Sequence, residues 1–429
     1  MDKKSIAIIG GGCSGTMLAW LLSPAYNVTL FEKEPQLGGH VFTYKAHTDN
    51  KNVPVDVGVD HINEKLCPNI FMILDKLHID TFVAPLSMNV LVDQKGHLAS
   101  WSNASNLGDL REKFVVEFNK FHKDMTYIAA HFDPKYLKIT VIDFLKSNNY
   151  SIDFAHLALV PLLTSYYGCK AHSLEYSILY VAVSFDMNLL SFFTPGYWRK
   201  ISGGMGSYIQ KISEKVCGDI FLNSSVAEVT KNSKEKLEIF LSDGKRFEFD
   251  EVVFATSAKD ASNCLNFSDI DYKGVLENFG YVPIEAILHT NEYKYKANGE
   301  YFAFYQGKND THGTLTRINR NLYPYEKLKT PLNVTFNPTE TIDEDRILCK
   351  KQWKLQTLRP IDGLFRSKIR DIQGKHGIWF CGTDTSVTGH EGAVVSAFVM
   401  ADKLGVPYEF RENKAAFAQF NTVKFIMGV

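Results

Sequence analysis

The chain has 429 residues, a formal net charge of −1 and 22% charged residues. This length predicts two or three folded units, and the balanced charge gives no electrostatic reason to expect a nucleic-acid partner. Seven widely spaced cysteines without a CxxC pair exclude a disulfide framework and a zinc site, so we expect no bound metal and a reducing, cytoplasmic location.

The first predicted element is a buried parallel strand at residues 6–9, Ile-Ala-Ile-Ile. Residues 10–15, Gly-Gly-Gly-Cys-Ser-Gly, follow it and fit the G-x-G-x-x-G pattern. Residues 16–22 then favour a helix, and residues 27–32 favour a second strand that ends on Glu32. This order and spacing predict a dinucleotide-binding β–α–β unit.

Each part of this unit has a physical role. Gly10 permits a tight turn, Gly12 lets the backbone approach a pyrophosphate, and Gly15 lets the helix pack close to the strand. Free N–H groups and the positive end of the helix dipole then face the phosphates. We expect Glu32 to accept hydrogen bonds from both hydroxyls of the adenosine ribose.

A second glycine pair, Gly38-Gly39, follows a few residues beyond Glu32 and is not part of a plain NAD site. Together with the turn "DVGVDHIN" at residues 56–63, it resembles FAD enzymes of the glutathione reductase-like fold, especially the flavin-containing amine oxidase superfamily. Relatives usually carry Arg after the glycine pair. This chain has His40 there, and a neutral histidine is a weaker phosphate partner than arginine.

Three later stretches support the same resemblance. Residues 197–216 contain a Gly-Gly-Met turn that in relatives starts a helix returning to the FAD domain. Residues 219–256 predict a strand, a hairpin with a Ser-Asp-Gly turn, and a final strand ending in Ala-Thr. Residues 377–405 predict a strand, a polar loop and a helix beginning near Glu391, which in relatives points its N-terminus at the flavin pyrimidine ring.

The resemblance implies noncovalent FAD, since no Cys–His pair marks a covalent flavin linkage. It assigns the cofactor to Gly10, Gly12, Cys13, Ser14, Gly15, Glu32, Lys33, Gly38, Gly39, His40, Val59, Val226, Thr256, Gly382, Asp384, Glu391, Gly392 and Ala393. Asp384 stands one residue later than the acid that binds the ribityl chain in relatives.

A closer resemblance runs over nearly the whole chain, to a bacterial subgroup described as NAD/FAD-binding or amine-oxidase-like proteins. It implies an α/β fold in which a Rossmann-like FAD-binding domain is interleaved with an α+β substrate domain. We expect residues 1–90, 200–270 and 345–429 to form the FAD-binding domain. Residues 90–200 and 270–345 then form the substrate-binding domain, with a helical part and a sheet.

The helical part contains an amphipathic pattern at Leu110, Phe114, Phe118, Phe121 and Met125. The sheet part is predicted from "YVPIEAILHT" and "EYFAFYQ", which alternate as strands do. The aromatic-rich residues 183–198 line a substrate tunnel in relatives and fit an apolar substrate; the alternative is that these aromatics fill the core.

The candidate catalytic residues are His61, in the turn expected near the flavin, and His390, just before the C-terminal helix. Structural hydrogen bonding is the alternative role for both. Lys294 and Lys296 are weaker candidates for the lysine that amine oxidases hold near the flavin. Because flavin carries out the redox step, no further acid or base is required by the sequence.

These features predict an FAD-dependent oxidoreductase that abstracts hydride from a C–H or C–N bond of a hydrophobic, fatty acyl or polyene-like substrate, as a desaturase would. Three alternatives stay open: a redox-neutral double-bond isomerase, an amine or amino-acid oxidase, and an FAD-binding protein with a structural or partner role. No stretch reaches the roughly 18 apolar residues of a membrane span. The sequence leaves peripheral membrane contact and oligomeric state open.

Overall fold

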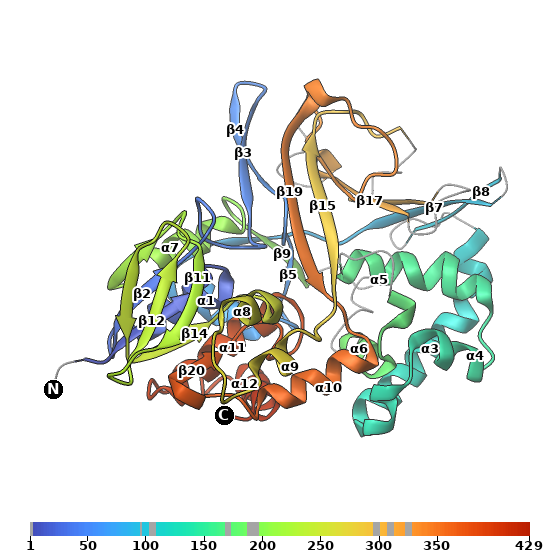
Figure 1. The fold of residues 1–429 in the computed structure, drawn as a ribbon. Coiled ribbons are helices and arrows are strands. Elements are labelled where there is room, and N and C mark those ends of the chain that lie inside the picture. The colour runs from blue at the N-terminus through green and yellow to red at the C-terminus, as the bar shows by residue number, and fades with distance from the viewer. Residues whose placement is uncertain are drawn as a thin grey trace.

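The computed structural model describes residues 3–94, 97–102, 109–167, 173–186, 197–294, 301–306, 313–321 and 328–429. Figure 1 shows a strand-rich part that contains the N-terminus, a helical part on the opposite side, and two long strands, β15 and β19, between them. The mixed α/β architecture with a Rossmann-type sheet confirms the predicted fold class.

The Rossmann-type sheet has five parallel strands in the order β10-β2-β1-β14-β20. Their bounds are Ser5–Ile9 (β1), Asn27–Phe31 (β2), Gly218–Phe221 (β10), Glu251–Phe254 (β14) and Ile378–Phe380 (β20). Three segments that are far apart in the sequence thus build one sheet. The predicted strand at residues 6–9 is its centre, where a run without polar residues is expected.

Both faces of β1 are covered, because successive side chains of a strand point to opposite faces. Ile6 and Ile8 pack into the main core with α1 (Cys13–Leu22) and α11 (Gly389–Lys403). Ala7 and Ile9 pack into a second core with a three-stranded antiparallel sheet. That sheet consists of β11 (Val226–Lys231), β12 (Leu237–Leu241) and β13 (Arg246–Phe249), with the predicted Ser-Asp-Gly turn between the last two strands.

The second large sheet has seven strands in the order β19-β15-β18-β17-β16-β7-β8. Their bounds are Met88–Gln94 (β7), His97–Ser102 (β8), Tyr281–His289 (β15), Phe302–Gln306 (β16), Thr314–Ile318 (β17), Asn333–Phe336 (β18) and Ile347–Gln356 (β19). β15 and β16 correspond to the two strands expected from alternation. β19 pairs with β15 here, although it falls within residues 345–429; the division into domains stays a prediction.

The helical part consists of α3 (Asp109–His131), α4 (Val141–Ser147), α5 (Val160–Tyr167) and α6 (Ile178–Asp186), with a π-helical segment at Phe154–Leu159. In α3, Phe114, Phe121 and Met125 are buried and Phe118 packs against the same core, as the amphipathic pattern predicts. No described helix is both long and apolar enough to cross a membrane.

The remaining strands and helices complete the fold. The strands are β3 (Thr43–Thr48), β4 (Lys51–Asp56), β5 (Ile62–Asn63), β6 (Thr81–Val83) and β9 (Trp198–Ile201). The helices are α2 (Pro68–Lys76), α7 (Gly206–Ser213), α8 (Ala258–Cys264), α9 (Tyr272–Leu276), α10 (Pro360–Ile369) and α12 (Lys414–Met427). Single 3₁₀ turns lie at Pro134–Lys138, Ser173–Glu175, Asn319–Asn321, Glu344–Arg346 and Lys375–Gly377.

Candidate active site

A cavity of about 1520 Å³ joins the Rossmann-type sheet to the seven-stranded sheet and the helical part. It exceeds the roughly 300–1,000 Å³ of an ordinary small-molecule site, so it has room for a large cofactor and a substrate. Its lining includes Gly10, Gly12, Cys13, Ser14, Glu32, Lys33, Gly38, Gly39, His40, Val59, His61, Val226, Thr256, Gly382, Asp384, His390, Glu391, Gly392 and Ala393. These are the predicted site residues except Gly15, and their individual roles stay predictions.

The glycine loop has the geometry that its sequence predicts. Gly10 has a φ of +101°, and its N–H donates to the Phe31 carbonyl at 2.8 Å, which fixes the turn between strand and helix. A Cβ on Gly15 would lie 1.9 Å from the Gly10 carbonyl oxygen, so Gly15 allows the helix to pack against the turn. A Cβ on Gly12 would meet no atom within 4 Å, because Gly12 borders the open cavity.

Glu32 closes the loop from the neighbouring strand. Its carboxylate accepts hydrogen bonds from the Gly11 N–H at 2.6 Å and from the Glu34 N–H at 2.8 Å. Each oxygen uses one of its lone pairs in this way and keeps another, since a carboxylate offers about four acceptor sites. Glu32 can therefore hold the loop and still accept hydroxyl groups from a ribose.

The second glycine pair lies against the first loop. The Gly38 N–H donates to the Gly11 carbonyl at 2.8 Å, so the two glycine segments together form one cradle. His40 follows at the cavity wall, edge-on to Trp353 with 5.6 Å between ring centroids. Desolvation at the cavity wall lowers the pKa of His40 to about 4, although part of the residue is exposed, so its ring is neutral at pH 7. Lys33 is exposed at the cavity edge.

The N-terminus of α11 borders the same cavity. The helix begins at Gly389, two residues before the predicted start, because the chain is still extended at Thr388. A Cβ on Gly389 would meet no atom within 4 Å. The Ser14 hydroxyl donates to the Ala393 carbonyl at 2.9 Å and joins α11 to α1. Two helix N-termini, each with free N–H groups, therefore face one cavity.

The side chain of Glu391 points to α2. Its Oε1 accepts from the Asn69 backbone N–H at 2.7 Å, and its Oε2 accepts from the Ile70 N–H at 3.1 Å. Glu391 thus satisfies free donors at the start of α2, and only its backbone can serve the cofactor as predicted. Burial raises the pKa of this carboxyl to about 7.

Asp384 lies in the polar loop after β20. Its Oδ2 accepts from the Ala258 N–H at 2.7 Å and from the Tyr281 hydroxyl at 2.5 Å. Its Oδ1 is buried and has no hydrogen-bond partner in the described part of the chain. A buried polar atom of this kind requires a partner, which a cofactor hydroxyl would supply. These glycine, helix and carboxylate features fit FAD.

His61 lies in a buried cluster of charged groups. Its Nδ1 is 2.9 Å from Asp60 Oδ2, and both side chains are almost fully buried. Arg317 Nη2 on β17 is 3.4 Å from Asp60 Oδ1, and Lys200 Nζ on β9 is 3.6 Å from Asp60 Oδ2. The Tyr301 hydroxyl donates to the same carboxylate at 2.8 Å. Asp60, His61 and Arg317 line the cavity.

The charges in this cluster set one another's ionisation. Burial alone would raise the pKa of Asp60, but Arg317, His61 and Lys200 outweigh it and hold that pKa well below its ordinary value. Burial lowers the pKa of His61, and Asp60 offsets this only in part, so His61 is neutral at pH 7. Asp60 then favours the tautomer with the proton on Nδ1, which leaves Nε2 as a proton acceptor.

His390 lies in a hydrogen-bonded chain without charges. Its Nε2 is 2.8 Å from the Tyr208 hydroxyl, and that hydroxyl is 3.0 Å from Cys13 Sγ. Burial lowers the pKa of His390 to about 4. The two candidate histidines therefore line one cavity in different surroundings: His61 among buried charges, His390 among neutral groups.

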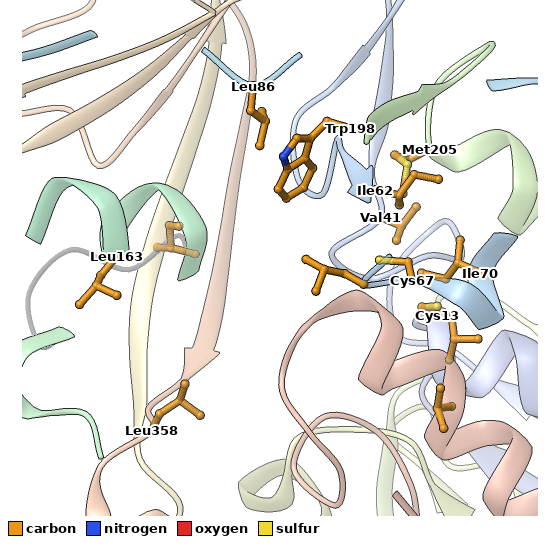
Figure 2. Close-up of a cluster of buried hydrophobic side chains, with 14 of the residues drawn as sticks. Cys13, Val41, Ile62, Cys67, Ile70, Leu86, Leu163, Trp198, Met205 and Leu358 are labelled. Carbon is orange, nitrogen blue, oxygen red and sulfur yellow. The ribbon is translucent and has the colours of Figure 1, made fainter. Parts of the chain in front are cut away.

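The described lining residues on the helical side of the cavity are mostly apolar. Described lining residues between Asn63 and Val183 carry no charged side chain: Asn63, Leu66, Cys67, Leu86, Ala129, Phe132, Ser165, Tyr176, Tyr180 and Val183. Figure 2 shows Leu163 and Leu358 on one side of this region and Trp198, Cys67 and Cys13 on the other. Val183 and Trp198 bound the predicted tunnel segment; residues 187–196 of it lie outside the described residues.

Two weaker candidates lie elsewhere. Lys294 is on the surface, where its Nζ is 3.0 Å from Glu340 Oε2, and it is not part of the cavity lining. Lys296 falls outside the described residues. Sequence reasoning missed Tyr208, although it follows the Gly-Gly-Met turn that had been identified. It also missed Asp60, which adjoins His61, and Arg317, which no local pattern marks.

Comparisons with known proteins agree with this geometry. A family model described as "Flavin containing amine oxidoreductase" matches residues 13–323. Among solved structures, cyclohexylamine oxidase from Brevibacterium oxydans IH-35A superposes with a TM-score of 0.70 at 16% identity, covering 94% of this chain and 100% of the other. The comparison with curated protein sequences found no match.

Two further structures share the fold. A CLA-producing fatty acid isomerase from P. acnes has a TM-score of 0.70 at 13% identity, covering 94% of this chain and 98% of the other. A wild-type putrescine oxidase bound to putrescine has a TM-score of 0.67 at 16% identity, covering 94% of this chain and 99% of the other. At these identities the superpositions establish the fold alone.

Proposed function

Because this chain belongs to the flavin-containing amine oxidoreductase family, we propose that it abstracts hydride from a C–H or C–N bond of an apolar molecule, such as a fatty acyl or polyene-like substrate. The chain is an FAD-dependent oxidoreductase, and the noncovalent attachment expected from the sequence is typical of the family. Bound FAD supplies the two-electron acceptor for such a reaction.

The observation that carries the proposal is the absence of charged side chains among the described lining residues on the helical side of the cavity. An apolar chain placed there buries its surface without leaving a charged protein group desolvated and unpaired. The described lining residues on that side include Leu86, Phe132, Tyr176, Tyr180 and Leu358.

Different residues of the chain would bind the cofactor and contact the substrate. Gly12, Gly39 and the start of α11 would hold the FAD phosphates and ring through backbone N–H groups, and Glu32 and Asp384 would accept its hydroxyls. His61, neutral and with Nδ1 toward Asp60, lies at the cavity wall, and because its Nε2 is buried, proton transfer from a substrate to this atom would require the ring to move. Asp60 orients that ring and stabilises it once it is protonated.

Anaerobic mixing of the FAD-loaded protein with a panel of apolar acids, alkenes and polyenes tests the proposal. Lasting bleaching of the flavin absorbance with one of them is the expected result. Turnover without lasting bleaching would instead establish a redox-neutral isomerase. Bound FAD that reacts with no member of either this panel or a panel of amines would favour a structural or partner role.

An amine substrate is the second candidate, because Glu285 on β15 lines the cavity and can neutralise an ammonium group. Peroxide release on a matched amine panel distinguishes the two. If the substrate is an amine, Glu285→Gln should raise the KM for amines at least tenfold. If the substrate is apolar, neither the wild type nor Glu285→Gln should turn over an amine.

A further inference from the structure

Tyr208 links the N-termini of the two helices that face the cavity. Cys13 is the first residue of α1, and His390 is the second residue of α11. The Tyr208 hydroxyl, on α7, lies 3.0 Å from Cys13 Sγ and 2.8 Å from His390 Nε2. Tyr208 is 1% exposed, so its hydroxyl depends on these two partners.

The direction of the hydrogen bonds follows from the chemistry of the three groups. Burial raises the pKa of Tyr208 well above its ordinary value and that of Cys13 to about 12, so both carry their protons at pH 7. A phenol has one proton to donate, and an imidazole nitrogen is a much better acceptor than a thiol sulfur. Tyr208 therefore donates to His390 Nε2, and the Cys13 thiol donates to Tyr208.

This arrangement determines the tautomer of His390. With Nε2 accepting, the proton of the neutral ring is on Nδ1. Although desolvation lowers the pKa of its ring, His390 keeps some surface open to the cavity, which it lines next to Gly389, whose Cα borders open space. The ring thus adds a side-chain N–H donor to the backbone donors at the start of α11.

We propose that Tyr208 is a positioning residue that fixes His390 as a neutral N–H donor toward the flavin ring and thereby stabilises the negative charge of reduced flavin. The inference requires bound FAD but not the substrate assigned above. A fixed donor that needs no reorganisation stabilises such charge effectively in a site shielded from water.

Sulfite binding to the FAD-loaded protein tests this without any substrate. The sulfur lone pair forms a bond to flavin N5, and an electron pair moves onto the pyrimidine side of the ring, so the association constant reports how well the site stabilises negative charge. We expect Tyr208→Phe to lower that constant about tenfold. For a two-electron couple this corresponds to a midpoint potential about 30 mV lower, measurable by dye equilibration.

A double-mutant cycle tests whether Tyr208 affects sulfite binding through His390. His390→Leu is expected to lower the sulfite constant as Tyr208→Phe does, and adding Tyr208→Phe to His390→Leu is expected to change nothing more. Tyr26→Phe is the matched control, since Tyr26 donates to the Leu404 carbonyl beyond the far end of α11. Additive losses, or a Tyr208→Phe constant within twofold of wild type, would overturn the proposal.

If the Tyr208→Phe protein does not retain FAD, two variants of His390 test the proposal in its place. His390→Asn places an amide N–H near the position of Nδ1 and needs no tautomer control, so its sulfite constant should stay within about threefold of wild type. His390→Leu should lose about tenfold. Equal constants for the two variants would show that no side-chain donor acts at this position.

Discussion

The glycine-rich wall of the cavity and the wall around Asp60 differ in whether their polar groups are already paired with other protein groups. Along the first, backbone N–H groups and the neutral rings of His40 and His390 line the cavity, and the Glu32 carboxylate accepts from two backbone N–H groups. At the second, Asp60, Lys200 and Arg317 are buried in contact with one another. The first wall can receive an anionic cofactor without giving up existing bonds, whereas the second depends on its own pairing.

The largest effect is expected at Asp60. Asp60→Ala removes the carboxylate that Lys200 and Arg317 share and leaves Lys200 with the more distant Asp56, whose Oδ2 is 3.9 Å from its Nζ. Removing one member of such a buried charged group typically costs about 3–5 kcal/mol of unfolding free energy. Urea denaturation of both proteins measures it. Asp219→Asn is the control, because Asp219 is exposed on β10 and should change stability by less than about 0.5 kcal/mol. A loss below about 1 kcal/mol at Asp60 would refute the dependence on pairing.

Two glycines of the other wall should separate folding from cofactor binding. Gly15→Ala places a methyl group against the Gly10 carbonyl, and such overpacking costs about 1–3 kcal/mol. Gly12→Ala meets no protein atom, so its unfolding free energy without FAD should stay near that of wild type while its FAD affinity falls at least tenfold. Denaturation of the apoprotein and flavin titration measure the two quantities. Undiminished FAD affinity in Gly12→Ala would contradict the assigned cradle.

A substitution of Arg366 on α10 is expected to raise the free energy of unfolding, in contrast to the substitutions above. It is 5% exposed and lies over the Tyr180 ring at 5.1 Å, and none of its side-chain nitrogens has a hydrogen-bond partner in the described part of the chain. Because a buried charge without such partners is unfavourable, Arg366→Met should raise the unfolding free energy by about 2 kcal/mol. Thermal unfolding tests the sign.

A control at the end of the same helix sharpens this test. Arg370 Nε donates to the Ile426 carbonyl at 2.9 Å at the end of α12. Its Nη2 also donates to the Phe425 carbonyl, so Arg370→Met removes hydrogen bonds that are made and should lower stability by about 1 kcal/mol. If both variants lose stability, the buried charge of Arg366 has stabilising interactions beyond its contact with the Tyr180 ring.

The smallest effect concerns pH. Burial raises the pKa of Glu391 to about 7, so its contribution to stability is greatest below the ordinary glutamate pKa and falls as pH rises through 7. Relative to Glu391→Gln, the wild type should lose about 1 kcal/mol between pH 6 and pH 8. Urea midpoints at several pH values measure this difference. A difference that does not change with pH would mean that Glu391 is already ionised at pH 6.

The nucleotide side could be predicted from the sequence because its parts are local. Gly10, Gly12 and Gly15 have backbone roles at fixed spacing, and Glu32 follows one parallel strand later, so adjacency in the chain becomes adjacency in space. The start of α11 was predicted two residues late because Gly389 carries no side-chain signal for a helix. The resemblance to a known superfamily, rather than periodicity, linked the C-terminal helix to the flavin.

By itself the sequence determined the cofactor-binding unit, since a β–α–β segment encodes its own turn, helix dipole and acid within about thirty residues. Only the tertiary structure decided the partners of the two histidines. Asp60, the neighbour of His61, meets Lys200 and Arg317, and Tyr208 meets both Cys13 and His390, although these residues come from distant parts of the sequence. No local pattern encodes such contacts, because they form only when separate sheets and helices pack around a shared cavity.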